Sequence, residues 1–410
     1  MSLEVLGEAR TSTGEMNHVT ELPNTAETNT IYGQAFNDAG LPGRLFRGTK
    51  RLLGSATTQR VMVFQKPFRL VALITPILLR IRKTISRKLM DLALDSEAAQ
   101  AACLGHPVNF EGRDADHNNI ALNRLSEAYA YAGIRKQSYY PEPTAATQSY
   151  LYDNPSDTRN LILTVDFGGG TLDFSVLKRR ESAFEVIGIH GVALGGDHID
   201  QCLFRSILFP LLGKGECWRR SVEGNEIETP FPFEAYESYL LNWTVSYMLN
   251  QNQFTTPVLD KISQGGPGAE KFERLYELIT QNSSYQIFQA IKDCKAALSE
   301  HNEVLLDIPD IDVSITIARE DFEAMISDQL ATFEQAVRDT LVNAGIAASE
   351  VELVIRTGGS SLIPAVKNIL ERYFPGKVIE HDPFTSVAAG LAIADYYGYG
   401  VTDAVSAVRF

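Results

Sequence analysis

The residues best suited to chemistry lie in the segment 161–177, where a run of strand-forming residues ends in a glycine turn and a second strand pattern follows. The turn and its flanks carry Asp166, Gly168, Gly169, Gly170, Thr171 and Asp173. Glycines lack a Cβ, so their amides can approach a polyanion closely and adopt positive φ. A carboxylate beside such a turn can hold a hydrated metal ion next to phosphates. The segment therefore predicts a phosphate loop rather than a plain hairpin, whose tip favours Asn-Gly or Asp-Gly.

Two further glycine elements follow in the sequence. The first contains Gly195 and Gly196 and continues into acidic residues up to position 200. The second is an apolar strand at 351–357, a turn at Gly358 and Gly359, and a helix that starts with Ser360 and a proline. A helix N-terminus behind a glycine turn suits anions and nucleotides. Three such elements in this order predict a nucleotide site.

These elements resemble those of the nucleotide-binding domain of the seventy-kilodalton heat-shock protein family. Similar segments are the second phosphate loop at 166–171, the LGGxDxD element at 194–200, the EPTAA motif at 140–146, the catalytic-lysine stretch at 48–54 and the adenosine loop at 358–360. The resemblance extends from about Tyr32 to about Tyr397. Residues 108–112 and 382–390 are more similar to the divergent YegD-like branch.

The resemblance implies an α/β chain with the actin-like ATPase fold, which is ribonuclease H-like, in two lobes around a nucleotide cleft. It implies ATP or ADP and Mg²⁺ as cofactors. Lys50, Glu142, Asp166 and Thr171 would be catalytic, and Glu142, Asp166 and Asp173 would hold the metal through waters. The other nucleotide contacts would be Gly168, Gly169, Gly170, Gly195, Gly196, Lys295, Ser299, Gly358, Gly359, Ser360 and Phe384.

Plainer interpretations exist for several of these residues. Lys50 could be a solvated lysine, although its glycine-flanked stretch favours the active site. Lys295 and Ser299, four residues apart, could form the surface of a helix. Asp173 could cap its own hairpin, and the prolines around Glu142 fit a rigid turn.

The sequence also departs from the family pattern. No Asp-x-Gly-Thr strand and turn, the family's first phosphate loop, occurs before Lys50; the nearest stretch is 11–14. Either the sequence begins after that loop, or the site has lost it. The adenosine clamp is altered, with Lys292, Ala296 and Leu362 at clamp positions and Phe384 near the base. No β-sandwich pattern follows the last helix. We therefore expect slow ATP hydrolysis at most and no peptide-binding domain.

Composition narrows the function further. The chain has 410 residues, is 44% hydrophobic and carries a formal charge of −14, which argues against non-specific nucleic-acid binding. Four scattered cysteines indicate free thiols in a cytoplasmic protein. The apolar stretch 71–79 is too short to span a membrane. The basic residues after it suggest a helix of the first lobe, with a membrane-surface helix as the alternative.

We expect three parts: lobe I at 1–157 without its first phosphate loop, lobe II at 158–377, and a C-terminal helix at 378–410 that returns to lobe I. Helices are expected at 69–91, 117–133, 236–249, 284–300, 319–345, 363–374 and 385–397.

The leading function is that of an ATP-binding, chaperone-related protein with a protein partner or co-chaperone. The alternatives are a non-catalytic scaffold and a small-molecule kinase of the same superfold.

Overall fold

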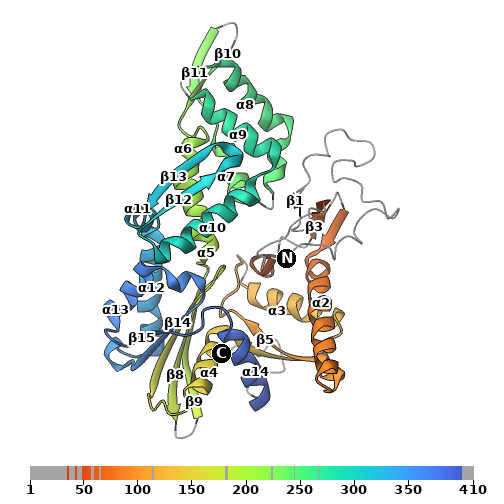
Figure 1. Ribbon diagram of the computed structural model, residues 1–410, viewed down its shortest axis with the longest axis vertical. Coiled ribbons are helices and arrows are strands. Elements are labelled where there is room, and N and C mark those ends of the chain that lie inside the picture. The colour runs from red at the N-terminus through yellow and green to blue at the C-terminus, as the bar shows by residue number, and fades with distance from the viewer. Residues whose placement is uncertain are drawn as a thin grey trace. The chain divides into compact units, whose positions relative to one another are not determined.

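The structure is a computed structural model that describes residues 35–36, 42–43, 49–56, 60–63, 66–112, 115–180, 183–222, 225–243, 245–266 and 268–398. The stretch 11–14, the nearest match to a first phosphate loop, lies outside the described residues, as does Gly48. The chain divides into two compact units, both drawn in Figure 1. The first is built mainly from Ile199–Ile326, and the second from Gly48–Val61, Phe68–His198 and Ser327–Phe410.

A five-stranded sheet forms the centre of the second unit, in the order β15-β14-β7-β8-β9. Strands β7, β8 and β9 form an antiparallel meander, and β14 runs parallel to both β7 and β15. Every residue of β7 is buried, which its apolar run predicts for a central strand. The strands span Leu161–Phe167 (β7), Leu172–Arg180 (β8), Ala183–Val192 (β9), Leu353–Thr357 (β14) and Val378–Glu380 (β15).

The two faces of this sheet are covered by different helices. On one face the Phe333 ring of α12 stacks on Phe167, with ring centroids 5.6 Å apart. On the other face, α4 joins the sheet through two hydroxyl pairs, Thr147 with Thr164 at 2.6 Å and Thr144 with Ser175 at 3.0 Å. Side chains alternate along a strand, so Asp166 and Asp173 share the α4 face with these hydroxyls.

Helix α14 packs tightly along α4. A Cβ on Gly390 would lie 1.7 Å from the carbonyl oxygen of Ala145, so only glycine permits this approach.

A second core cluster lies between α2, α3 and the parallel pair β5 and β6. The helices of the second unit are Thr49–Leu52 (α1), Leu70–Asp91 (α2), His117–Tyr131 (α3), Glu142–Asp153 (α4), Ser327–Ala344 (α12), Pro364–Tyr373 (α13) and Ser386–Tyr397 (α14). Its smaller elements are Ala101–His106 (β5), Lys136–Pro141 (β6), Ser96–Gln100 (η2), Ala348–Glu350 (η6) and Gly359–Leu362 (η7).

The first unit is mostly helical, with two antiparallel hairpins, β10-β11 and β12-β13. Its core is rich in aromatic rings, such as Phe231 against Phe272 with centroids 4.6 Å apart. Its helices are α5 (Gly196–Leu203, which begins in the second unit), α6 (Phe209–Leu211), α7 (Glu234–Leu240), α8 (Asn252–Gln264), α9 (Ala269–Gln281), α10 (Ser284–Glu300) and α11 (Arg319–Met325). A π-helical segment, η3 (Phe204–Leu208), joins α5 to α6, and η4 (Ser246–Asn250) and η5 (Pro309–Ile311) are short 3-10 helices. Its strands are β10 (Cys217–Val222), β11 (Asn225–Pro230), β12 (Glu303–Ile308) and β13 (Val313–Ala318). The short strands β1 (Ala35–Phe36), β2 (Pro42–Gly43), β3 (Arg60–Val63) and β4 (Lys66–Arg69) complete the described elements.

Most of the expected helices are present, but the single helix expected at 236–249 is wrong. The chain forms α7, a break, and the short 3-10 turn η4 instead. Asn242 and Val245 lie in the break, and both are poor helix formers. The aromatic spacing therefore reflected burial rather than one continuous helix. The expected helix at 319–345 is likewise two helices, α11 and α12.

All four cysteines are free, as expected from their spacing. Within the described part of the chain, no helix is long and apolar enough to cross a membrane.

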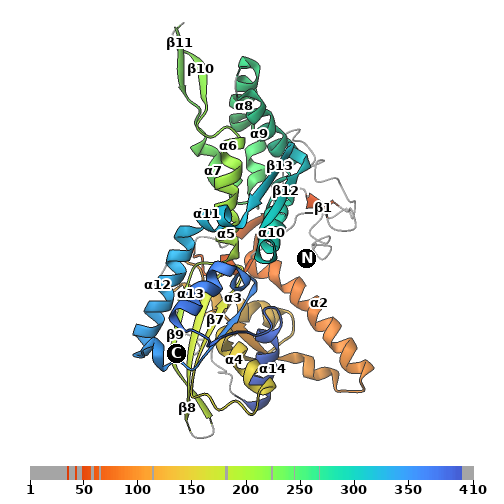
Figure 2. The same ribbon diagram turned by 60° about the vertical axis from the view of Figure 1, so that its left-hand side comes forward.

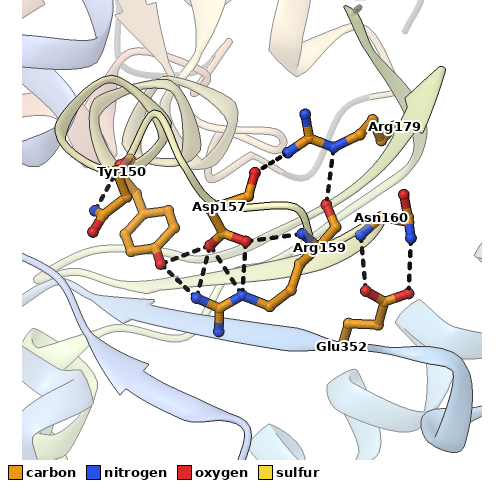
Figure 3. Close-up of polar contacts among 7 residues, drawn as sticks. Tyr150, Asp157, Arg159, Asn160, Arg179 and Glu352 are labelled. Atoms are coloured by element: carbon orange, nitrogen blue, oxygen red, sulfur yellow. Dashed lines mark hydrogen bonds and ion pairs between the residues drawn. The ribbon is translucent and has the colours of Figure 1, made fainter. Parts of the chain in front are cut away.

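A charged network fixes the start of β7, at the end of the strand away from the glycine turn (Figure 3). The Arg159 Nε donates to both carboxylate oxygens of Asp157 at 2.9 Å, and the Tyr150 hydroxyl donates to one of them at 2.8 Å. The Arg179 guanidinium donates to the Asp157 carbonyl at 2.6 Å, which ties β8 to the same turn. Burial alone would raise the pKa of Asp157, but the hydrogen bonds from Arg159 and Tyr150 lower it to about 2.

We expect Asp157→Asn to lower the free energy of unfolding by about 2 kcal/mol at pH 7, because the lowered pKa reports stabilisation of the ionised form. A carboxyl whose pKa is lower in the folded protein stabilises the folded state at pH values above its unfolded pKa, near 3.8. This stabilisation is lost as the pH falls toward about 2. The difference from the parent chain should therefore hold from pH 7 to 5 and shrink below pH 4 in urea titrations. The exposed neighbour change Asp153→Asn is the matched control. A difference independent of pH would contradict an ionic origin.

Candidate functional site

Two carboxylates face each other at the mouth of the glycine turn. Asp166 at the end of β7 and Asp173 at the start of β8 are direct partners in the antiparallel register. Such partners place their Cβ atoms about 5 Å apart, and like charges there repel. The loop closes with a hydrogen bond from the Gly168 amide to the Thr171 carbonyl, 3.1 Å. The predicted strand, turn and returning strand are confirmed.

A lysine and a glutamate lie close to this pair of carboxylates. Helix α4 begins at Glu142 directly after β6, and Pro143 in its first turn suits a helix start. The Lys50 Nζ of α1 donates to both oxygens of Glu142, at 2.7 and 2.6 Å. The Lys50 side chain is 45% exposed and that of Glu142 17%, so the ion pair opens toward solvent at its lysine end.

Burial and mutual repulsion keep the two aspartates from ionising readily. Burial, followed by repulsion from Glu142 and Asp173, raises the pKa of Asp166 to about 7 against the opposing charge of Lys50. Burial also raises the pKa of Asp173 to about 7, although a hydrogen bond from Thr171 works against it. Desolvation lowers the pKa of Lys50, but attraction to Glu142, and more weakly to Asp173 and Asp166, outweighs it and raises the pKa. The site therefore gains from an added cation.

The remaining glycine elements assemble around the same loop. Gly196 and Asp197, at the start of α5, donate their amides to the carbonyls of Gly168 and Gly169, at 3.0 and 2.8 Å. The Ser360 hydroxyl donates to the Gly168 carbonyl at 3.0 Å. Thr357 pairs with Asp166 in the sheet, so the β14 turn begins beside the phosphate loop.

Some of these glycines are required by the fold and others are not. A Cβ on Gly195 would lie 2.3 Å from the Gly169 carbonyl oxygen, and one on Gly358, which has φ +81°, would lie 2.5 Å from the Phe167 oxygen. A Cβ on Gly168 or Gly169 would instead meet nothing closer than 3.7 Å. None of the three loop glycines has positive φ, so their expected left-handed conformation is not observed. The open space above them is where a polyanion could approach the backbone.

The oxygen-rich donor set fits a magnesium ion held through water. Oδ2 of Asp173 is buried without a hydrogen-bond partner among the described residues. No three acidic, histidine or cysteine side chains of the described residues are close enough to bind a metal directly. Mg²⁺ commonly keeps several waters and takes only one or two carboxylates directly, so Asp166, Asp173 and Glu142 would hold it mainly through those waters.

One contact at this site had no signal in the sequence. The Val108 amide donates to Oδ1 of Asp173 at 2.8 Å, from the loop that follows β5. A Cβ on Gly191 of β9 would lie 3.0 Å from the same oxygen and 2.9 Å from the Asn109 amide nitrogen, so glycine allows the loop to approach. Backbone donors of this kind leave no trace in residue type.

Of the three other expected nucleotide contacts, Phe384 lies beside the 358–360 turn and two lie in the first unit. Phe384 is 79% exposed, and its ring lies 3.8 Å from where a Gly359 Cβ would be. Lys295 and Ser299 lie on α10 in the first unit, where the Lys295 Nζ is 2.5 Å from a carboxylate oxygen of Asp200. Both side chains of this ion pair are largely buried. The structure therefore brings together the loop, Lys50, Glu142 and 358–360, whereas Lys295 and Ser299 belong to the other unit.

We expect Asp166→Asn to stabilise the ligand-free protein above neutral pH. A carboxyl whose folded-state pKa is raised reduces stability as pH rises from the unfolded value near 3.8 through about 7. The variant lacks this loss, so its melting temperature should exceed that of the parent by roughly 2–4 °C at pH 8 and match it near pH 4. Calorimetry without nucleotide or metal measures this, with the exposed Asp307→Asn as control. A lower melting temperature at pH 8 would show that the buried charge is compensated.

We expect Gly169→Val to keep the fold but to weaken nucleotide binding at least tenfold, since the side chain has room in the free protein but occupies the approach to the amides. Gly195→Val should instead lower the melting temperature, because its Cβ would overlap the Gly169 carbonyl. Titration calorimetry with ADP and thermal melts separate the two effects. Unchanged affinity in folded Gly169→Val would make the loop purely structural.

Comparisons with known proteins cover most of the segments that form this site. A family model described as Hsp70 protein matches residues 84–210 and 269–396, which include Glu142, the phosphate loop and 358–360 but not Lys50. The Chaperone protein HscA homolog of Azoarcus sp. is 28% identical over 276 residues, covering 65% of this chain and 33% of that protein. The Chaperone protein dnaK1 of Synechocystis sp. is 26% identical over 318 residues, covering 74% and 37%.

The chain thus spans about a third of the length of these curated relatives. Their names do not identify a YegD-like branch, which stays a prediction. The family match covers more than half of the chain and confirms the family expected from the glycine motifs. The chain belongs to the Hsp70 family, and its α/β architecture is that family's actin-like, ATP-binding fold.

Proposed function

We propose that this chain binds ATP or ADP with Mg²⁺ at the loop Gly168–Thr171 and hydrolyses ATP slowly. The observation that carries the proposal is the convergence of Lys50, Glu142, Asp166 and Asp173 on a glycine loop in which Gly168 and Gly169 have room for a Cβ that the protein's own packing does not fill. Phosphoryl transfer to water needs positioned phosphates, a divalent ion and an oriented nucleophile, with little covalent participation by the protein.

Each residue has a definite part in this proposal. The amides of Gly169 and Gly170 hold phosphate oxygens, and the Thr171 hydroxyl joins them by turning away from Asp173. Lys50, kept protonated by Glu142, places a positive charge at the terminal phosphate. Bound Mg²⁺ would supply neutralising charge at the phosphates, and Asp166 and Asp173 would orient its waters.

The slow rate and relaxed base preference follow from sequence differences. Residues 1–49 of this sequence contain no Asp-x-Gly-Thr pattern, and a site that works without such a pre-placed charge stabiliser commonly reacts about a hundredfold or more slowly. At the positions that match the family's adenosine clamp, this chain has Lys292 and Ala296, both exposed on α10. A third position has Leu362 where the family has an arginine. Guanidinium stacking on the base is therefore absent from these positions. We infer that Phe384, exposed beside Gly359, contacts the base instead.

The chaperone names of the relatives favour a chaperone-related role with a protein partner. A non-catalytic scaffold remains the second candidate, and nucleotide binding without turnover would favour it. The small-molecule kinase has no observation in its favour beyond the shared fold.

The test is single-turnover ATP hydrolysis with purified protein and Mg²⁺. Lys50→Ala should reduce the rate at least tenfold while the chain remains folded, because it removes the positive charge next to Glu142. The exposed change Lys367→Ala on α13 is the control and should leave the rate unchanged. A Lys50→Ala rate equal to the parent rate, or no detectable binding of ADP and Mg²⁺ by the parent, would overturn the proposal.

A further inference from the structure

A single apolar stripe on α2 passes from the protein core into solvent. The residues Ile74, Leu78, Ile81 and Ile85 are spaced by four, three and four positions, which places them on one face of the helix. Ile74 and Leu78 are 8% and 7% exposed, but Ile81 and Ile85 are 42% and 45% exposed. The same face thus serves as core in the first half of α2 and is uncovered in the second.

The uncovered part, which we call the outer half of α2 (residues 79–92), contains further exposed apolar side chains. Met90 is 65% exposed and Leu92, its C-cap residue, 57%. The outer half is about 20 Å long at 1.5 Å per residue. Figure 2 shows it extending beyond α3 at the edge of the second unit. Exposed apolar side chains gathered on one segment in this way usually mark an interaction site.

The charge of the outer half is opposite to that of the whole chain. It carries five basic residues and one acidic residue, Asp91, in a protein of formal charge −14; the basic residues are Arg80, Arg82, Lys83, Arg87 and Lys88. On a helical wheel Arg82 and Lys88 flank the apolar stripe, and Lys83 and Arg87 lie on the opposite face. Arg82 also donates to the Ala132 carbonyl at 2.7 Å, which holds the helix to the end of α3.

We propose that the outer half of α2 is a docking surface for anionic phospholipid bilayers. Aliphatic side chains on one face and long basic side chains around it are the features that let a helix lie in a charged membrane interface. The lysine and arginine stems can extend past the apolar stripe to reach head groups. The negative charge elsewhere on the chain would be repelled by the same surface and so limits contact to this helix.

The composition of the surface favours a bilayer over a protein or a nucleic acid. The anchors of interfaces between proteins are most often Trp, Tyr and Arg side chains in fitted pockets, and the outer half of α2 offers arginines but no aromatic residue. A nucleic acid would use the basic residues but would leave Ile81 and Ile85 in water. A fluid anionic bilayer uses both the charge and the aliphatic stripe.

The experiment is flotation of the full chain with vesicles of phosphatidylcholine alone or with about a third phosphatidylglycerol, at low and at 0.5 M salt. We expect binding to anionic vesicles at least tenfold stronger than to neutral ones, and weakened by salt. Arg87→Glu with Lys88→Glu should reduce binding at least tenfold. Ile85→Asn should also reduce it, which a purely electrostatic contact would not predict. The control Lys136→Glu with Lys367→Glu makes the same charge change at exposed sites on β6 and α13.

Several results would overturn the proposal. These are no binding to anionic vesicles, equal binding to neutral vesicles, or an equal loss in the control pair. Binding of polyglutamate or single-stranded DNA at the same affinity, unaffected by Ile85→Asn, would identify a general polyanion surface instead. Circular dichroism of each variant verifies that α2 and the rest of the chain remain folded, and nucleotide affinity should not change because the outer half lies outside the proposed nucleotide site.

Discussion

The structure is organised around the burial of two carboxylates at the end of β7 and the start of β8. Asp166 and Asp173 are partners in the sheet and both are more than nine-tenths buried. Like charges in that arrangement repel, and removal from water disfavours each charge further. Lys50 supplies one positive charge, but Glu142 already accepts from it through both oxygens. The three carboxylates therefore outnumber the one lysine, and a bound cation would balance the remaining negative charge.

The surrounding elements limit how this cluster could relax. Its α4 face is fixed by the hydroxyl pairs between α4 and the sheet, and the opposite face by the Phe333 ring. The Val108 amide holds one oxygen of Asp173. At the far end of β7, the Asp157 network fixes where the strand begins. Because both ends of β7 are fixed, Asp166 cannot easily turn away from its partner. Its pKa is raised mainly by burial and further by the charges of Glu142 and Asp173.

The sequence predicted the parts of this site that depend on residue type. Three glycines after a buried strand, with an acid at each end, predict the hairpin, and Gly358 predicts the turn beside it because only glycine fits there. Once the register of β7 and β8 is known, the alternation of strand side chains explains why both aspartates lie on one face. Contacts made by the backbone were not predictable, as with the Val108 amide. The break between α7 and η4 was missed because apolar spacing reports burial, which a helix and a compact irregular segment share.

The glycines of the site fall into two classes that sequence alone could not separate. Gly195 and Gly358 are required by atoms already present, since a Cβ at either would overlap a carbonyl of the phosphate loop. Gly168 and Gly169 have room for a side chain and ordinary φ, so the protein's own packing does not explain them. Glycine in such a position lowers stability through the entropy of the unfolded chain. A feature that reduces stability and is not needed for packing is best explained by a ligand, and the adjacent buried carboxylates indicate that the ligand brings a cation with it.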